Sequence, residues 1–130
     1  MTELIAGYAT AAATKKYSET FGNACAPGHY SDFLNLHLQL SSLGVGTFPG
    51  AASDEVDAAY AGVIERALLN GINVVDTAAH YRYCRSPSAV GEGLRRALAR
   101  GVAREQVYLI SKGGFLGFRD GPPAAFEKWF

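Results

Sequence analysis

This 130-residue sequence contains no long apolar run and no excess of charge of one sign. No stretch is apolar for long enough to span a bilayer, and an N-terminus with Glu3 and no basic segment does not resemble a secretory signal. Lysine plus arginine number 12, as do aspartate plus glutamate, so the balanced charge gives no electrostatic footprint for nucleic acid or an anionic membrane. We therefore expect a cytoplasmic protein with neither a nucleic-acid nor a membrane partner.

Cysteine is also scarce, with Cys25 and Cys84 the two copies. They do not form a C-x-x-C pair, and no histidine lies at zinc-finger distance from them, so the sequence predicts no metal site and no redox motif. A disulfide between the two is one possibility. Two free thiols in a reducing compartment is the favoured interpretation.

The composition fits one ordinary globular domain. Hydrophobic residues make up 48% of the chain and charged residues 18%, and a chain of this length buries about two-thirds of its unfolded surface. Residues 1–30 are expected to form an N-terminal extension to a main domain at residues 31–130. Residues Thr2 to Phe21 are alanine-rich with few large apolar groups, which predicts a helix that packs weakly or frays. A loop follows to Tyr30, with His29 expected to be exposed and idle.

After this loop, hydrophobic residues recur at every second position. Leucines alternate with polar residues through Phe33 to Leu40, which predicts a strand with one wet face. Ser41 and Ser42 are expected to form a turn into a second short strand at residues 43–46. The two strands together predict a hairpin that covers one end of the core.

Helical and strand patterns then alternate along the chain. The predicted helices cover residues 53–70, capped by Ser53, and 86–100, capped by Ser86, and a further helix begins within residues 124–130. The predicted strands end at Gly46, Asp76 and Ile110. This order is typical of an α/β fold in which parallel strands are joined by right-handed crossovers.

Three polar residues lie at or just beyond the ends of these strands, namely Asp76, Tyr81 and Lys112. In a parallel sheet they would share the edge where ligands bind. A phenol titrates near pH 10, a neighbouring ammonium favours its phenolate form, and a paired carboxylate keeps that ammonium charged. Such a group is suited to protonating an oxygen on which negative charge builds. From spacing alone, the more common alternative is a turn-capping aspartate, a solvated lysine and a loop tyrosine.

The glycine-rich loop after the first of these strands is less informative. Gly46 and Gly50 allow the backbone to approach a ligand closely. The pattern G-x-G-x-x-x-G at residues 44–50 misses the dinucleotide-binding fingerprint by one residue. The acidic residue that this motif requires at the end of a second strand, about 20 residues on, is also absent. A plain turn is the favoured interpretation from these residues.

Four segments resemble the N-terminal third of an aldo-keto reductase. They are L-G-V-G-T-F at 43–48, G-I-N-V-V-D-T-A-A-H-Y at 71–81, S-A-V-G-E-G-L at 88–94 and Y-L-I-S-K at 108–112. The resemblance implies part of an eight-stranded (β/α) TIM barrel, with a floor hairpin and about three βα units. It also implies hydride transfer from NADPH or NADH to a small-molecule aldehyde or ketone.

The resemblance implies a role for each matching residue. Tyr81 would be the proton donor, Lys112 would tune it, and Asp76 would pair with Lys112. Gly46, Thr47 and Asp76 would lie along the nicotinamide end of the cofactor. The family's fourth catalytic group, a histidine on the strand after the lysine, is missing because the chain's 3 histidines all precede Lys112.

Length is the main departure from the family. A (β/α) barrel requires about 200 to 250 residues, so we expect this chain to be a truncated and inactive fragment of a longer reductase. Two alternatives stay open. One is a short protein that assembles with itself or with a second fragment, and the other is a non-catalytic remnant that binds a partner. The oligomeric state is left open.

Overall fold

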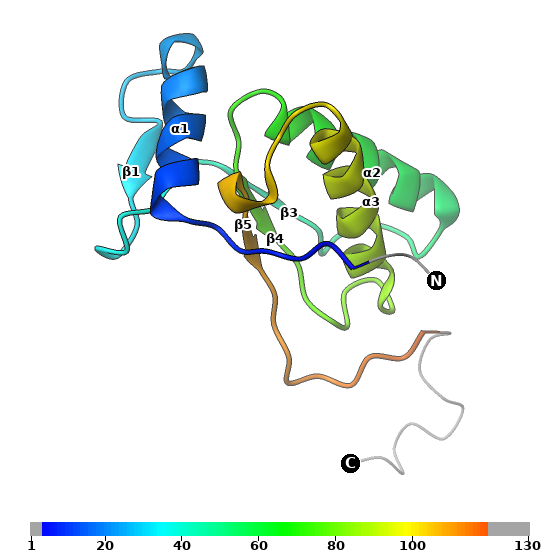
Figure 1. The fold of residues 1–130 in the computed structure, drawn as a ribbon. Helices are drawn as coiled ribbons and strands as arrows, with labels where there is room; N and C mark the ends of the chain where they lie inside the picture. The colour runs from blue at the N-terminus through cyan, green and yellow to red at the C-terminus, as the bar shows by residue number, and fades with distance from the viewer. Residues whose placement is uncertain (1–3, 120–130) are drawn as a thin grey trace.

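Two α-helices pack side by side against one face of a three-stranded parallel sheet (Figure 1). The computed structural model describes residues 4–119. The strands are β3 (Gly44–Gly46), β4 (Val74–Asp76) and β5 (Tyr108–Ile110), in the order β3-β4-β5. The crossovers are α2 (Asp54–Leu68) and α3 (Arg85–Ala99). The predicted α/β fold with parallel strands is therefore confirmed.

The helix boundaries follow from local chemistry. The Ser53 hydroxyl accepts a hydrogen bond from Val56 N at 3.4 Å, so the predicted cap of α2 is confirmed. The second cap prediction was wrong, because α3 begins at Arg85 and the Ser86 hydroxyl instead donates to Thr47 O at 2.6 Å. This hydrogen bond joins the first turn of α3 to the loop after β3. The helix predicted within residues 124–130 lies outside the described residues.

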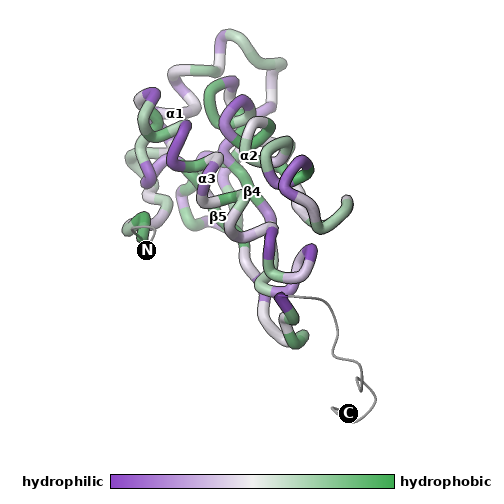
Figure 2. Tube along the Cα trace, turned by 90° about the vertical axis from the view of Figure 1, so that its right-hand side faces the viewer, coloured by the Kyte–Doolittle hydropathy of each residue, from purple (hydrophilic) through white to green (hydrophobic). Residues whose placement is uncertain are grey.

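The core lies between the sheet and the two helices. Its fully buried members come from α2, β4, α3 and the approach to β5: Ile64, Leu68, Val75, Ala97 and Val107. Gly93 brings the two helices together, since a Cβ there would lie 2.7 Å from Ala61 O and 2.8 Å from Ile64 Cβ. Figure 2 shows hydrophobic and hydrophilic residues alternating along α2, as an amphipathic helix requires.

The predicted hairpin exists but its strands are misplaced. The observed pair is β1 (Tyr30–Asp32) with β2 (Gln39–Ser41), antiparallel, whereas β3 pairs with β4 in the parallel sheet. The strand predicted over residues 33–40 is interrupted by a turn, in which Leu34 and Leu36 are 74% and 55% exposed. Leu34, Asn35 and His37 have positive φ. The alternation of leucines marks burial only at Leu38 and Leu40, where the chain has returned to the core.

The N-terminal helix is shorter and better anchored than predicted. Helix α1 runs over Ala11–Phe21, preceded by a non-helical segment and followed by the 3-10 turn η1 (Gly22–Ala24). The expectation of a fraying helix was wrong, since Tyr17 is 1% exposed and its hydroxyl donates to Leu68 O at 2.7 Å. One buried aromatic residue with a satisfied hydroxyl replaces the aliphatic stripe that the sequence lacks.

His29 was also predicted incorrectly. Its ring Nε2 lies 3.0 Å from Gly71 O, and Ser42 Oγ lies 3.1 Å from its Nδ1. The Tyr30 hydroxyl donates to the same Gly71 carbonyl at 2.7 Å. These contacts tie the loop after α1 to the turn that precedes β4.

Two further observations concern the described residues as a group. Cys25 and Cys84 are both free thiols. Within residues 4–119, no helix is long and apolar enough to cross a membrane.

Asn73 fixes the hairpin to the sheet. Its side chain is fully buried, accepts from Ser41 N at 2.9 Å, and donates to Gln39 O and Gln106 O at 3.0 and 3.2 Å. Gln106 ends the 3-10 turn η2 (Arg104–Gln106) that leads into β5. One amide therefore sets the relative positions of β2, β4 and β5.

Replacing Asn73 with alanine should lower the free energy of unfolding by about 2–3 kcal/mol, because it leaves buried backbone groups without partners. The matched control is Asn70→Ala, which removes one exposed hydrogen bond to Arg66 O and should cost less than about 1 kcal/mol. Urea denaturation of both variants provides the measurement. Equal losses would contradict the role assigned to Asn73.

Candidate active site

The lysine and aspartate at the strand ends meet at the carboxyl edge of the parallel sheet. Asp76 ends β4 and pairs in register with Ile110, which places Lys112 two residues beyond its level. The Lys112 ammonium donates to Asp76 Oδ1 at 2.6 Å and to Thr77 O at 2.8 Å. The two side chains are 42% and 36% exposed, so the pair is open to solvent on one side.

The third residue of the set, Tyr81, lies beside this ion pair. The Lys112 ammonium is 5.0 Å from the centroid of the Tyr81 ring. The hydrogen bond with Asp76 raises the pKa of the Lys112 ammonium above its usual value, against an opposing contribution from desolvation, and the Tyr81 hydroxyl raises it further. The structure thus brings Asp76, Tyr81 and Lys112 together around one charged nitrogen.

Two other aromatic rings contact the ring of Tyr81. The Phe48 ring meets the Tyr81 ring edge to face at 5.1 Å, and the His80 ring does so at 5.0 Å. Phe115 in turn contacts His80 at 5.1 Å. Sequence reasoning missed these neighbours, because an isolated aromatic residue in a loop carries no spacing signal that would reveal its partner.

Thr47 connects the strand ends from within the protein. It is fully buried, and its hydroxyl donates to Asp76 O at 3.0 Å. Its carbonyl accepts from Ser86 Oγ at 2.6 Å. Thr47 therefore holds the end of β3 against the end of β4 and directly supports the backbone of Asp76.

Gly46 leaves open space at the end of β3. The two residues are register partners in the β3–β4 pair, and a Cβ added at Gly46 would meet no atom within 4 Å. The contrast is Gly44, where a Cβ would lie 3.1 Å from Val74 Cγ1. A side chain at Gly44 would press against Val74, whereas Gly46 keeps a surface open where a ligand can approach the backbone.

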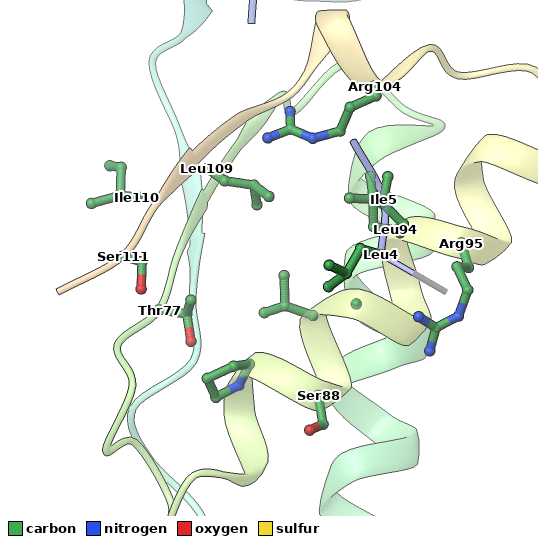
Figure 3. A pocket seen from close by; sticks show the side chains of 13 residues that line it. Leu4, Ile5, Thr77, Ser88, Leu94, Arg95, Arg104, Leu109, Ile110 and Ser111 are labelled. Atoms are coloured by element: carbon green, nitrogen blue, oxygen red, sulfur yellow. The ribbon is translucent and has the colours of Figure 1, made fainter. Parts of the chain in front are cut away.

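A cavity of about 380 Å³ lies elsewhere, between β5, α3 and the N-terminal segment. Figure 3 shows Leu109, Leu94 and Ile5 around it, with Arg104 on one side and Ser88 on the other. Asp76, Tyr81 and Lys112 are not among its lining residues. Because the titratable groups suited to chemistry gather at the strand ends instead, we place the candidate active site there.

All 3 histidines of this sequence precede Lys112, and one of them, His80, packs against Tyr81. In the part of the chain that the structure describes, no cluster of three or more histidine, cysteine, aspartate or glutamate side chains could hold a metal ion. The polar groups that the structure does bring together at the strand ends are a phenol and an ion pair.

Comparison with known proteins identifies the family of this chain. The sequence profile of the Aldo/keto reductase family matches residues 42–127, which is more than half of the chain. The chain belongs to the aldo/keto reductase family. The matched region contains Gly46, Asp76, Tyr81 and Lys112, and the family resemblance inferred from the sequence motifs is confirmed.

One curated relative shows how far the likeness extends. The chain is 38% identical over 80 residues to a protein of Hypocrea jecorina named D-galacturonate reductase. The alignment covers 61% of this chain and 23% of that relative, so the chain spans about a quarter of the relative's length. No solved structure matches the chain significantly.

The ion pair can be tested through the titration of Lys112. An Asp76→Asn variant should lower the pKa of the Lys112 ammonium toward its ordinary value, because the charged acceptor is gone. The measurement is a pH titration of the labelled side-chain Nζ by NMR. Asp32→Asn, which removes a carboxylate that pairs with His37, is the control and should leave the titration unchanged. An unaltered pKa in Asp76→Asn would show that the pair does not form.

Proposed function

We propose that these residues supply the proton-donating part of an NAD(P)H-dependent reductase that converts an aldehyde or ketone to an alcohol. The observation that carries the proposal is the Lys112–Asp76 ion pair beside the Tyr81 ring, at the carboxyl edge of a parallel sheet. That edge is where parallel α/β folds carry out chemistry. Family membership supports the same reaction class.

The proposed reaction adds a hydride to the carbonyl carbon and a proton to the carbonyl oxygen. The nicotinamide cofactor, NADPH or NADH, supplies the hydride when it is bound. The Tyr81 hydroxyl donates its proton to the oxygen as negative charge builds there. The Lys112 ammonium stabilises the resulting phenolate, and Asp76 keeps that ammonium charged and in place. A proton from water then restores Tyr81.

The strand ends also fit the flat nicotinamide end of such a cofactor. Gly46 presents backbone with open space where a Cβ would stand, and it is the register partner of Asp76 on the neighbouring strand. We propose that Gly46 and Asp76 contact the nicotinamide end, and that Thr47 supports them from the interior.

A sugar acid with a free aldehyde is the substrate class that we propose to test first. The support is the similarity to a protein named D-galacturonate reductase. The aromatic rings of Phe48 and Tyr81 offer an apolar surface against which the carbon face of a sugar can pack.

We propose that further βα units complete the site, either on a longer polypeptide or on a second chain. Within residues 4–119, β3 and β5 each have one edge without a paired strand. The cavity beside β5 and α3 lies where the next helix of a repeating βα array would pack. The complete fold would be a (β/α)8 barrel, and the 130 residues alone should show neither measurable turnover nor micromolar NADPH binding.

Tyr81→Phe tests the role of the phenol. In the protein expressed from its natural gene, this variant should lower kcat for D-galacturonate by about 10² to 10⁴-fold with little change in KM. Consumption of reduced nicotinamide gives the rate. Tyr83→Phe is the control, since Tyr83 is exposed two residues away. An undiminished rate in Tyr81→Phe would reject the proton-donor role. A folded wild type that reduces no aldehyde would favour the non-catalytic remnant instead.

Gly46→Ala tests the open surface. The added methyl group enters free space, so the free energy of unfolding should stay constant or rise by up to about 1 kcal/mol. NADPH binding to the natural gene product, followed by fluorescence, should weaken because the methyl group covers the approach to Asp76. Gly44→Ala should have the opposite effect on stability. Its free energy of unfolding should fall, because the added methyl group would press against Val74. Unchanged NADPH affinity in Gly46→Ala would argue against cofactor contact there.

A further inference from the structure

The three residues that follow Tyr81 have a left-handed backbone. Arg82, Tyr83 and Cys84 have φ of 50°, 55° and 66°. None of them is glycine or asparagine, the residues that adopt this conformation readily. Such a run persists only where surrounding contacts determine it, and it is most often found where a site needs the resulting geometry.

The Arg82 side chain connects this run to distant parts of the chain. It is 1% exposed, and its Nε and Nη2 atoms donate to Ala51 O at 3.0 and 2.7 Å. Nη2 also donates to Asp57 Oδ1 at 2.7 Å, in the first turn of α2. The guanidinium carbon lies 5.1 Å from the centroid of the Tyr60 ring. A single planar cation thus joins the loop after β4 to the segment before α2.

Asp57 shares its carboxylate between two arginines. Oδ2 accepts from Arg85 Nε at 2.8 Å while Oδ1 accepts from Arg82, and Arg85 also contacts Asp54. Burial works against ionisation, yet hydrogen bonds from Arg85 and Arg82 hold the pKa of Asp57 below its usual value. The two arginines differ in setting, because the Arg85 side chain is 32% exposed.

Backbone hydrogen bonds link the left-handed run and the start of α3 to Tyr81. Arg85 N donates to Arg82 O at 3.2 Å, and Ser86 N donates to Tyr81 O at 3.3 Å. Tyr81 N in turn donates to Ala78 O at 3.1 Å. With its carbonyl and amide both bonded, Tyr81 has its orientation set by the geometry of the residues on either side.

We propose that Arg82 is a positioning residue that orients Tyr81 over Lys112 through a buried clamp on Ala51 and Asp57. The proposal rests on the proton-donor role proposed for Tyr81. Arg82 touches neither substrate nor cofactor, and it acts by keeping the left-handed run from relaxing. Loss of the clamp lets Tyr81 move away from the ammonium that supports it, which lowers the rate of proton transfer without altering the substrate-binding surface.

Arg82→Gln and Arg85→Gln form the matched pair for the test, because both remove a cation from Asp57. In Arg82→Gln, NMR cross-peaks between the Tyr81 ring and the Lys112 side chain should disappear. In the natural gene product kcat should fall about tenfold or more at unchanged KM. Arg85→Gln should keep the cross-peaks and most of kcat. Persistence of both in a folded Arg82→Gln variant would overturn the proposal.

Arg82→Gly separates positioning from relief of backbone strain and serves where the glutamine variant fails to fold. Glycine accepts the left-handed conformation but has no side chain for the clamp. The proposal predicts the same loss of Tyr81–Lys112 cross-peaks as in Arg82→Gln, and intact cross-peaks in Arg82→Gly would overturn it. The cross-peaks report on position alone. If Tyr81→Phe leaves kcat unchanged, the proposed function fails while the role of Arg82 is still decided.

Discussion

The candidate site depends on one contact, the hydrogen-bonded ion pair between Lys112 Nζ and Asp76 Oδ1 at 2.6 Å. That contact exists because β4 and β5 are parallel and in register, so both side chains leave the sheet at the same edge. Asn73, directly before β4, donates to Gln106 O ahead of β5, and Thr47 supports the end of β4. The elements that make up the fold therefore also determine where the ammonium lies.

Tyr81 is placed by a second constraint that acts outside the sheet. Its loop follows β4 directly, but its course is set by the left-handed run after it and by the buried fork of Arg82 on the first turn of α2. The strand ends provide the charge, and the clamp provides the orientation of the phenol relative to that charge. A reaction that needs a proton at one position requires both.

Sequence reasoning succeeded where local signals determined the outcome. The cap at Ser53, the strand ending at Asp76 and the lysine just beyond the next strand are short-range features, and parallel βα units bring such ends to one edge. It failed where distant contacts decided. Tyr17 is anchored by a carbonyl 51 residues away, and Leu34 lies in a turn because β1 pairs with β2 rather than continuing. The contacts of Arg82 were not predicted, since its partners Ala51 and Asp57 lie in a different segment.

The most direct test of the account is a double-mutant cycle on Tyr81 and Lys112 in the protein expressed from its natural gene. If the phenol and the ammonium act as one proton-donating unit, Tyr81→Phe and Lys112→Met should each lower kcat by about 10² to 10⁴-fold. The double variant should then be hardly slower than the more damaged single variant. Losses that multiply would show that the two residues act independently, and this would contradict the central claim.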